Sequence, residues 1–194
     1  GEASVPASRV QVLAPQRGKP GIYRIVADGD SFAVDLGFTS FQALSSVQAR
    51  DTKANDLVTL SSAGQPVPAP DANKTDLYTY DAEIIRVVDG DTLWLKIWLK
   101  SGHWLKEKVR LRGLDCPELD TPEGKAAKRF VEALVKEAAS VVITSIKPDK
   151  WDRYLSDIFL RCEDSEELFL NNLLLENGHA RRYDKVTPAD WEDE

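Results

Sequence analysis

The 194-residue sequence contains no methionine, only two cysteines and only two histidines. Cys116 and Cys162 have neither the short spacing of a metal-ligand pattern nor the number needed for a disulfide framework. We interpret them as reduced thiols in or near the core. His103 and His179 also lack companions at ligand spacing, so we interpret them as a surface residue and a core-edge residue.

Long apolar runs are also absent. No stretch approaches the roughly 18 to 20 apolar residues that a membrane span needs, and the first residues lack the basic and apolar regions of a signal peptide. With 42% hydrophobic residues and five tryptophans, the sequence predicts a soluble globular protein without a membrane partner. Because the chain does not begin with Met, we expect a processed or cloned fragment. That leaves the compartment open, with the cytoplasm slightly favoured.

An excess of positive charge is missing too. The 25 basic residues are outnumbered by 32 acidic ones, for a net charge of −7. This excludes a global electrostatic footprint for nucleic acid. Contact with a polyanion must therefore come from a local cluster of basic residues, with metal ions offsetting the nearby carboxylates.

Composition divides the chain into three parts. Residues 1–61 hold short β-type runs between polar turns and predict a small β-rich module of unknown role, after a tail with a candidate edge strand at 9–13. Within it, residues 38–49 are ambiguous. Residues 62–76 are rich in proline, alanine and serine and predict a linker. Residues 77–194 carry the clearest patterns and predict the main domain.

Alternation and capping signals predict the elements of this main domain. Strands are expected at 80–88, 91–99, 104–113, 141–146 and 155–162. Helices are expected from Thr121 to about Ala138, over 168–176 before the Asn177–Gly178 stop, and from Thr187. Three strands in a meander, a helix, two strands and a second helix predict a mainly β fold with helices, an OB-type five-stranded barrel.

Acidic residues lie at the ends of the predicted strands between residues 87 and 118. Asp91 opens the second strand, Asp115 follows the third, and Glu118 comes after Cys116–Pro117. Arg110 lies on the polar face of the third strand, and Arg153 follows some forty residues later. Oxygen ligands for a hard cation, guanidinium groups for a phosphate and a carboxylate for water are what phosphodiester hydrolysis requires. Strand-end caps and surface ion pairs are the structural alternative.

Residues 23–32 partly repeat residues 85–93, including the Asp-Gly pair. A degenerate repeat and ordinary hairpin-turn chemistry both explain this. The first copy lacks a continuation like that of residues 110–118, so it predicts no second site.

Four motifs in this order resemble the staphylococcal-nuclease-like (thermonuclease) family of calcium-dependent nucleases. They are Val-Asp-Gly-Asp-Thr at 88–92, Arg-Leu-Arg-Gly-Leu-Asp-Cys-Pro-Glu at 110–118, Asp-Lys-Trp-Asp-Arg-Tyr-Leu at 149–155, and Asn171 through Gly178-His179-Ala180. The resemblance covers about residues 80–183 and leaves the first 75 or so residues unrecognised. It implies hydrolysis of DNA or RNA with little sequence preference, in which water attacks phosphorus and the 5′-oxygen leaves.

The resemblance also implies roles for individual residues. Asp91 and Asp115 would be Ca²⁺ ligands, with the backbone carbonyl of Cys116 as a third. Glu118 would activate or orient the attacking water. Two arginines would hold the phosphate and stabilise the transition state, namely Arg110 and Arg153.

Other positions match the family less closely. The family commonly has Thr or Ala where Cys116 stands, and often Tyr-Gly where Trp151 and Asp152 stand. The resemblance implies substrate contacts by a lysine and two aromatic residues, namely Lys150, Trp151 and Tyr183. Asp89 is interpreted as a turn residue near the metal. We interpret Lys106 and Lys108 as a solvated face, and we assign a packing role to Trp94, Trp98 and Trp104.

Two alternatives to a nuclease stay open. The domain could be a nucleic-acid- or protein-binding module that keeps the fold without catalysis, although such modules usually lose the acidic ligands or the arginines. The amino-terminal module could carry the main function instead, by docking a protein partner or targeting the substrate.

Overall fold

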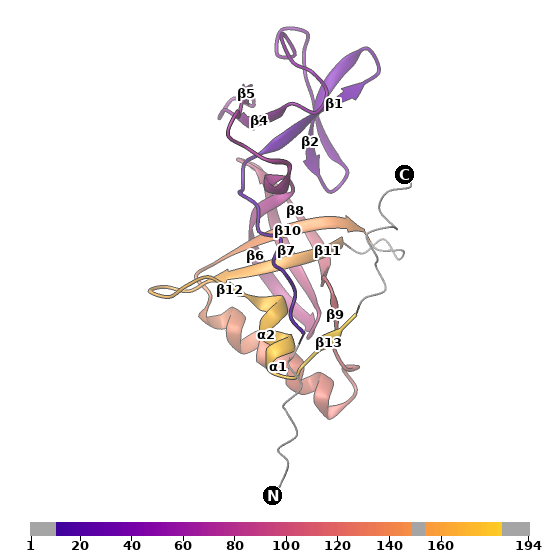
Figure 1. Ribbon diagram of the computed structural model, residues 1–194, viewed down its shortest axis with the longest axis vertical. Helices are drawn as coiled ribbons and strands as arrows, with labels where there is room; N and C mark the ends of the chain where they lie inside the picture. The colour runs from indigo at the N-terminus through magenta and orange to yellow at the C-terminus, as the bar shows by residue number, and fades with distance from the viewer. Residues whose placement is uncertain (1–10, 149–153, 184–194) are drawn as a thin grey trace, which may run out of the picture.

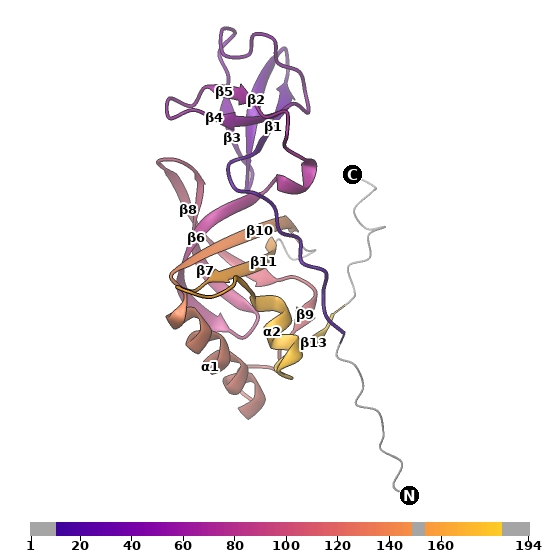
Figure 2. The same cartoon turned by 60° about the vertical axis from the view of Figure 1, so that its left-hand side comes forward.

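The computed structural model describes residues 11–148 and 154–183, which form an amino-terminal antiparallel sheet, a closed five-stranded barrel and two helices (Figure 1). The predicted class, mainly β with helices, is therefore confirmed. Both views place the amino-terminal sheet at one end of the barrel and the helices at the other (Figure 2). No helix in the described part of the chain is long and apolar enough to span a membrane.

The barrel consists of β6 (Thr79–Asp89), β7 (Thr92–Lys100), β8 (His103–Leu111), β10 (Ser140–Pro148) and β11 (Tyr154–Arg161). The first three strands form an antiparallel meander. β11 then pairs in parallel with β8, and β10 pairs with both β11 and β6, which closes the barrel. The prediction of a five-stranded barrel is confirmed.

Strict alternation in β7 determines which side chains fill the barrel. Leu93, Leu95, Ile97 and Leu99 are completely buried, while the residues between them face outward. Burying each of these side chains contributes about 1.5–3 kcal/mol. A register slip by one residue would expose all four, so burial fixes the register of β7.

The two helices cover one end of the barrel. α1 (Pro122–Glu137) begins as predicted, because Thr121 Oγ1 accepts a hydrogen bond from the Gly124 amide at 3.0 Å and Pro122 occupies the first turn. α2 (Leu170–Glu176) starts two residues later than predicted. The preceding Leu168–Phe169 form β12, which pairs with β11. The helix predicted from Thr187 lies outside the described residues.

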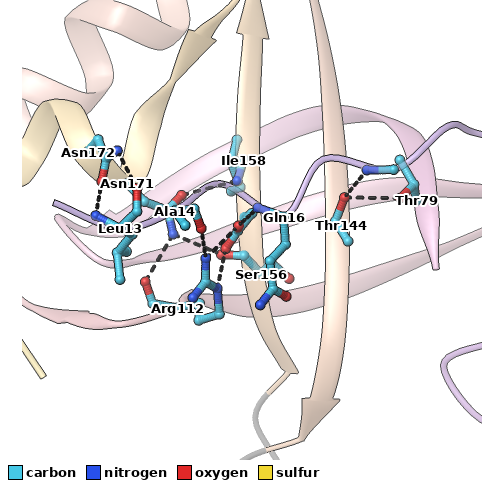
Figure 3. Close-up of polar contacts among 12 residues, drawn as sticks. Leu13, Ala14, Gln16, Thr79, Arg112, Thr144, Ser156, Ile158, Asn171 and Asn172 are labelled. Carbon is cyan, nitrogen blue, oxygen red and sulfur yellow. Dashed lines mark hydrogen bonds and ion pairs between the residues drawn. The ribbon is translucent and has the colours of Figure 1, made fainter. Parts of the chain in front are cut away.

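Asn171 locks α2 to the barrel and is completely buried. Its side-chain amide donates to the carbonyls of Arg112 and Ser156 at 3.1 and 3.2 Å, and its Oδ1 accepts from the Ile158 amide at 3.1 Å (Figure 3). These three hydrogen bonds satisfy main-chain groups of β11 and of Arg112, the residue directly after β8. A buried polar residue is stable here because each of its polar atoms has a partner.

The amino-terminal sheet has the strand order β3-β2-β1-β4-β5. Its strands are β1 (Tyr23–Asp28), β2 (Ser31–Gly37), β3 (Ser40–Ala43), β4 (Leu57–Leu60) and β5 (Pro66–Pro68). The ambiguous interval 38–49 thus contains β3, and the interval expected as a linker contains β5 and a 3-10 turn, η1 (Lys74–Asp76). We propose that this sheet and the region from residue 77 onward are two units of one chain.

Specific polar contacts join the amino-terminal sheet to the barrel. The Tyr80 hydroxyl donates to the Leu36 carbonyl, and the Tyr78 hydroxyl donates to Asp35 Oδ2, each at 2.7 Å. Burial and the hydrogen bond to Asp35 raise the pKa of Tyr78 to about 12. Gly37 has φ of +82°, and a Cβ atom on it would lie 1.8 Å from the Tyr80 hydroxyl oxygen. Glycine at this position therefore permits the contact.

Residues 11–18, here called the amino-terminal strap, form no strand and run along the barrel next to α2 (Figures 2 and 3). Leu13 is buried, and its amide and carbonyl both hydrogen-bond to the Asn172 side chain, at 2.8 and 2.9 Å. The Gln16 amide donates to Asp157 Oδ2 at 2.8 Å. The edge strand expected at 9–13 is therefore absent over its described residues, 11–13.

Asp157 is completely buried and receives a two-pronged ion pair from Arg112, at 2.7 and 2.8 Å. The guanidinium also donates to the Ala14 carbonyl at 2.9 Å. One carboxylate of β11 therefore links the segment directly after β8 to the strap. Planar pairing of this kind gives both strength and fixed geometry.

Replacing Asp157 by alanine should lower the free energy of unfolding by about 3 kcal/mol, because Arg112 and the Gln16 amide lose a buried partner. Denaturant titration measures this change. Arg161→Ala is the matched control, since it removes a more exposed ion pair to Glu167, 3.0 Å long, and should cost less than about 1 kcal/mol. Equal losses in the two variants would contradict a linking role for Asp157.

Candidate active site

The candidate site starts at the turn between β6 and β7. The Asp91 amide donates to Asp89 Oδ1 at 3.1 Å, so Asp89 does act as a turn residue. A Cβ atom on Gly90 would lie 2.8 Å from both Cys116 Sγ and Ala127 Cβ. Glycine therefore lets this turn lie directly against the segment after β8. The close approach brings Asp91 next to Cys116, whose amide donates to Asp91 Oδ2 at 3.0 Å.

Arg110 connects the two predicted acidic ligands. Its Nη1 lies 3.4 Å from Asp91 Oδ2, and its Nη2 donates to Asp115 Oδ1 at 2.9 Å. Nη2 also lies 3.4 Å from the Leu114 carbonyl. The guanidinium is largely buried, and Asp91 is almost completely so. The structure thus brings together two acidic residues 24 positions apart that the sequence assigned to one site.

Negative charge exceeds positive charge at this point. Burial is the main cause that raises the pKa of Asp91 to about 6, and a hydrogen bond with Asp89 is the second. Burial and the carboxylates of Asp91, Asp89 and Asp115 raise the pKa of the Cys116 thiol. Burial opposes the charge on Arg110, but Asp91 and Asp115 outweigh it and raise the pKa of its guanidinium. Three carboxylates around one guanidinium favour the binding of a further cation.

Two short strands that the sequence did not indicate complete the site. β9 (Leu114–Asp115) pairs with β13 (Arg181–Arg182), with Asp115 opposite Arg181. Arg181 Nη2 lies 3.9 Å from Asp115 Oδ2, and this side chain is 85% exposed. Strands of two residues have no periodicity. The Arg-Arg pair ahead of Tyr183 was therefore the only signal, and it was not specific.

Tyr183 follows β13, and its ring centroid lies 6.0 Å from the Arg110 guanidinium carbon. Its amide donates to the Gly113 carbonyl at 3.0 Å, which anchors the backbone there. The structure therefore places this predicted substrate contact beside the site.

Glu118 lies in the exposed loop between β9 and α1. Its carbonyl accepts hydrogen bonds from the Thr121 amide and hydroxyl, at 3.0 and 2.6 Å. Its side chain has no hydrogen bond to any described residue. A Cβ atom on Gly124 would lie 1.9 Å from the Glu118 carbonyl oxygen, so α1 and this loop touch through a glycine. The helix cap fixes the backbone of the loop and leaves the carboxylate exposed.

Comparison with known proteins finds a family match for the carboxy-terminal part of the chain. Residues 108–194 match the family model described as "Staphylococcal nuclease homologue". The carboxy-terminal half of the chain is a staphylococcal-nuclease-like domain. The chain is also 38% and 37% identical, over 93 residues, to two rice (Oryza sativa subsp. japonica) proteins, "Probable staphylococcal-like nuclease CAN2" and "CAN3". Each alignment covers 46% of this chain but only 24% and 23% of the relative, so the chain spans about a quarter of their length.

The family match begins at Lys108, so it includes Arg110 and Asp115 but not Asp91. The hydrogen bond from Cys116 and the Arg110 ion pair connect Asp91 to the matched part of the nuclease-like domain. Three further predicted site residues lie outside the described residues, namely Lys150, Trp151 and Arg153.

The candidate site presents oxygen donors suited to a hard cation. Asp91 and Asp115 supply carboxylates, and the main chain of Cys116 lies beside them. The described residues contain no group of three or more His, Cys, Asp or Glu side chains placed to hold a metal. Two carboxylates completed by a main-chain carbonyl nevertheless fit the ligand chemistry of calcium, and the excess negative charge has the right sign.

Gly124→Ala should destabilise the nuclease-like domain by about 1–3 kcal/mol, because the added methyl group overlaps the Glu118 carbonyl. Helix propensity alone predicts the opposite sign, a gain of up to about 1 kcal/mol. The sign of the stability change in a thermal or denaturant melt therefore shows whether the steric overlap or the helix propensity dominates. Lys125→Ala, at the neighbouring exposed position, is the control and should stay within about 0.5 kcal/mol. A stabilised Gly124→Ala protein would show that the loop does not depend on this contact.

Proposed function

We propose that this chain is a calcium-dependent phosphodiesterase that hydrolyses DNA, RNA or both with little sequence preference. The observation that carries the proposal is the position of Arg110 between Asp91 and Asp115, at 3.4 and 2.9 Å. A guanidinium that touches both expected metal ligands is well placed to grip a phosphate bound beside them. The printed names of the two rice relatives, probable staphylococcal-like nucleases, support the same reaction class.

Each residue has a chemical task in this proposal. Asp91, Asp115 and the Cys116 carbonyl would hold calcium, which when bound polarises a phosphate oxygen. Arg110 and Arg153 stabilise the charge that builds on phosphorus oxygens in the transition state. Glu118 takes up a proton from the attacking water or orients it, as its exposed carboxylate allows, and the 5′-oxygen leaves.

Substrate contacts would come from the residues around this centre. Tyr183 lies near Arg110 and offers a ring for a base or sugar to stack on. Lys150 and Trp151 are assigned the same task on sequence grounds. Arg181 joins them, because its exposed guanidinium lies next to Asp115 and adds positive charge at the rim.

Cleavage of labelled single- and double-stranded DNA and RNA with calcium, magnesium or neither tests this function. The wild-type protein should cleave only with calcium, and Arg110→Ala and Glu118→Ala should each lower turnover by about 100-fold or more. Arg129→Ala, which removes an exposed arginine of α1, should cleave like the wild type. Circular dichroism confirms that each variant is folded.

No cleavage with calcium, with the chelator control equally flat, would rule out the nuclease. Calorimetric titration with calcium then separates the remaining alternative. A metal-binding signal that disappears in Asp91→Asn would support the proposed ligands, whereas no signal in the wild type would favour a binding module without a metal site.

A further inference from the structure

The outer face of the β7–β8 hairpin carries tryptophans and lysines in alternation. On this face, every second cross-strand pair joins two of them: Trp94 with Lys108, Lys96 with Lys106, and Trp98 with Trp104. All six side chains point away from the core, because the residues between them in β7 are completely buried. We call them the aromatic-basic stripe, composed of Trp94, Lys96, Trp98, Trp104, Lys106 and Lys108.

Contacts within the stripe show that its members share one surface. The Lys96 ammonium lies 4.6 Å from the ring centroids of both Trp98 and Trp104. Lys108 lies 6.0 Å from the Trp94 ring. Trp104 is 47% exposed, so the packing role assigned to it from the sequence is wrong. The three outward tryptophans do not fill the barrel, since the opposite face of β7 does so.

The stripe leads directly into the candidate active site. The next cross-strand pair after Trp94 and Lys108 is Thr92 with Arg110, and Thr92 donates to Asp91 at 3.0 Å. Arg110 and Trp104 are six residues apart on one strand, a span of about 20 Å. A polymer held at Arg110 could therefore continue over the stripe without leaving the surface.

The charge of the stripe is complementary to a polyanion. It holds three lysines, although the chain as a whole is acidic. Glu107 alternates with them and pairs with buried Leu95 across the hairpin, so it lies on the other face. On the β6 flank, Glu83 lies opposite Lys96 and Arg86 lies opposite Trp94, which adds one charge of each sign.

We propose that the aromatic-basic stripe binds a single-stranded nucleic acid alongside the scissile phosphate, an inference that rests on the proposed nuclease function. Unpaired bases stack on tryptophan rings while lysines contact the phosphates, the usual combination in proteins that bind single strands without sequence preference. The second and third strands of OB-type barrels form a common ligand face. A duplex keeps its bases stacked inside and gains only the lysine contacts.

Fluorescence anisotropy tests this with labelled oligothymidylates of about 4 and 12 nucleotides and a duplex of about 12 base pairs. The full chain is used with calcium and Glu118→Ala, which keeps the probe intact. Trp104→Ala should weaken binding of the longer strand by at least about fivefold, and Trp104→Phe should restore most of it. Lys106→Ala with Lys108→Ala should lower the slope of log affinity against log salt by about 1.4, or 0.7 for each phosphate contact.

Lys19→Ala with Lys74→Ala is the matched control, since it removes two exposed lysines outside the β7–β8 hairpin. It should leave the slope unchanged. Three outcomes would each overturn the proposal. The stripe variants could keep wild-type affinity and slope, they could lose equal affinity for the short and long strands, or they could lose equal affinity for duplex and single strand. If binding depends on the stripe but the wild-type protein cleaves nothing, the proposed nuclease function is rejected and the proposed binding role of the stripe is supported. Calcium-dependent cleavage combined with binding that does not depend on the stripe would support the nuclease and reject the binding role of the stripe.

Discussion

The structure around the site depends on carboxylates that pair with two arginines, one near the end of β8 and the other directly after it. Arg112 is paired with completely buried Asp157. Arg110 is held by Asp91 and Asp115. The chain offers the same chemistry at both positions, but the surroundings give it different uses. Around Arg112 one carboxylate matches one guanidinium, and the pair is structural. Around Arg110 the carboxylates are in excess, so the charge is left unbalanced.

Burying a carboxylate in this cluster costs free energy, because the charged form loses its contact with water. Asp91 is pushed to a pKa of about 6 by burial and by Asp89, despite the Cys116 amide and Arg110 acting against the shift. A protein selected only for stability would neutralise or expose such a carboxylate. Perturbed carboxylates beside an arginine are typical of sites that bind charged ligands. The same cluster is therefore suited to the cation and the phosphate of the proposed reaction.

Much of the barrel could be predicted from the sequence, because strands with one buried face show a strict alternation of apolar and polar residues. Residues 93–99 alternate without a break, and Thr121–Pro122 marks the start of α1 by chemistry that is purely local. The strap could not be predicted in this way. Its amides bind to Asn172 and Asp157, side chains more than 140 positions away. The pairing of β9 with β13 could not be predicted either, because strands of two residues show no periodicity. The site residues were found through motifs, whereas Arg181 belongs to no motif.

The amino-terminal part of the chain contributes to the frame of the site through β11. Gln16 of the strap hydrogen-bonds to Asp157 in the middle of that strand. Phe38 of the amino-terminal sheet has its ring 4.5 Å from that of Tyr154, the first residue of the strand. Tyr154 and Leu155 pair in turn with Val109 and Arg110 of β8. Two separate amino-terminal contacts thus hold the strand on which the backbone of Arg110 is aligned. The sheet and strap are structural neighbours of the candidate site, although the family match lies entirely beyond them in the sequence.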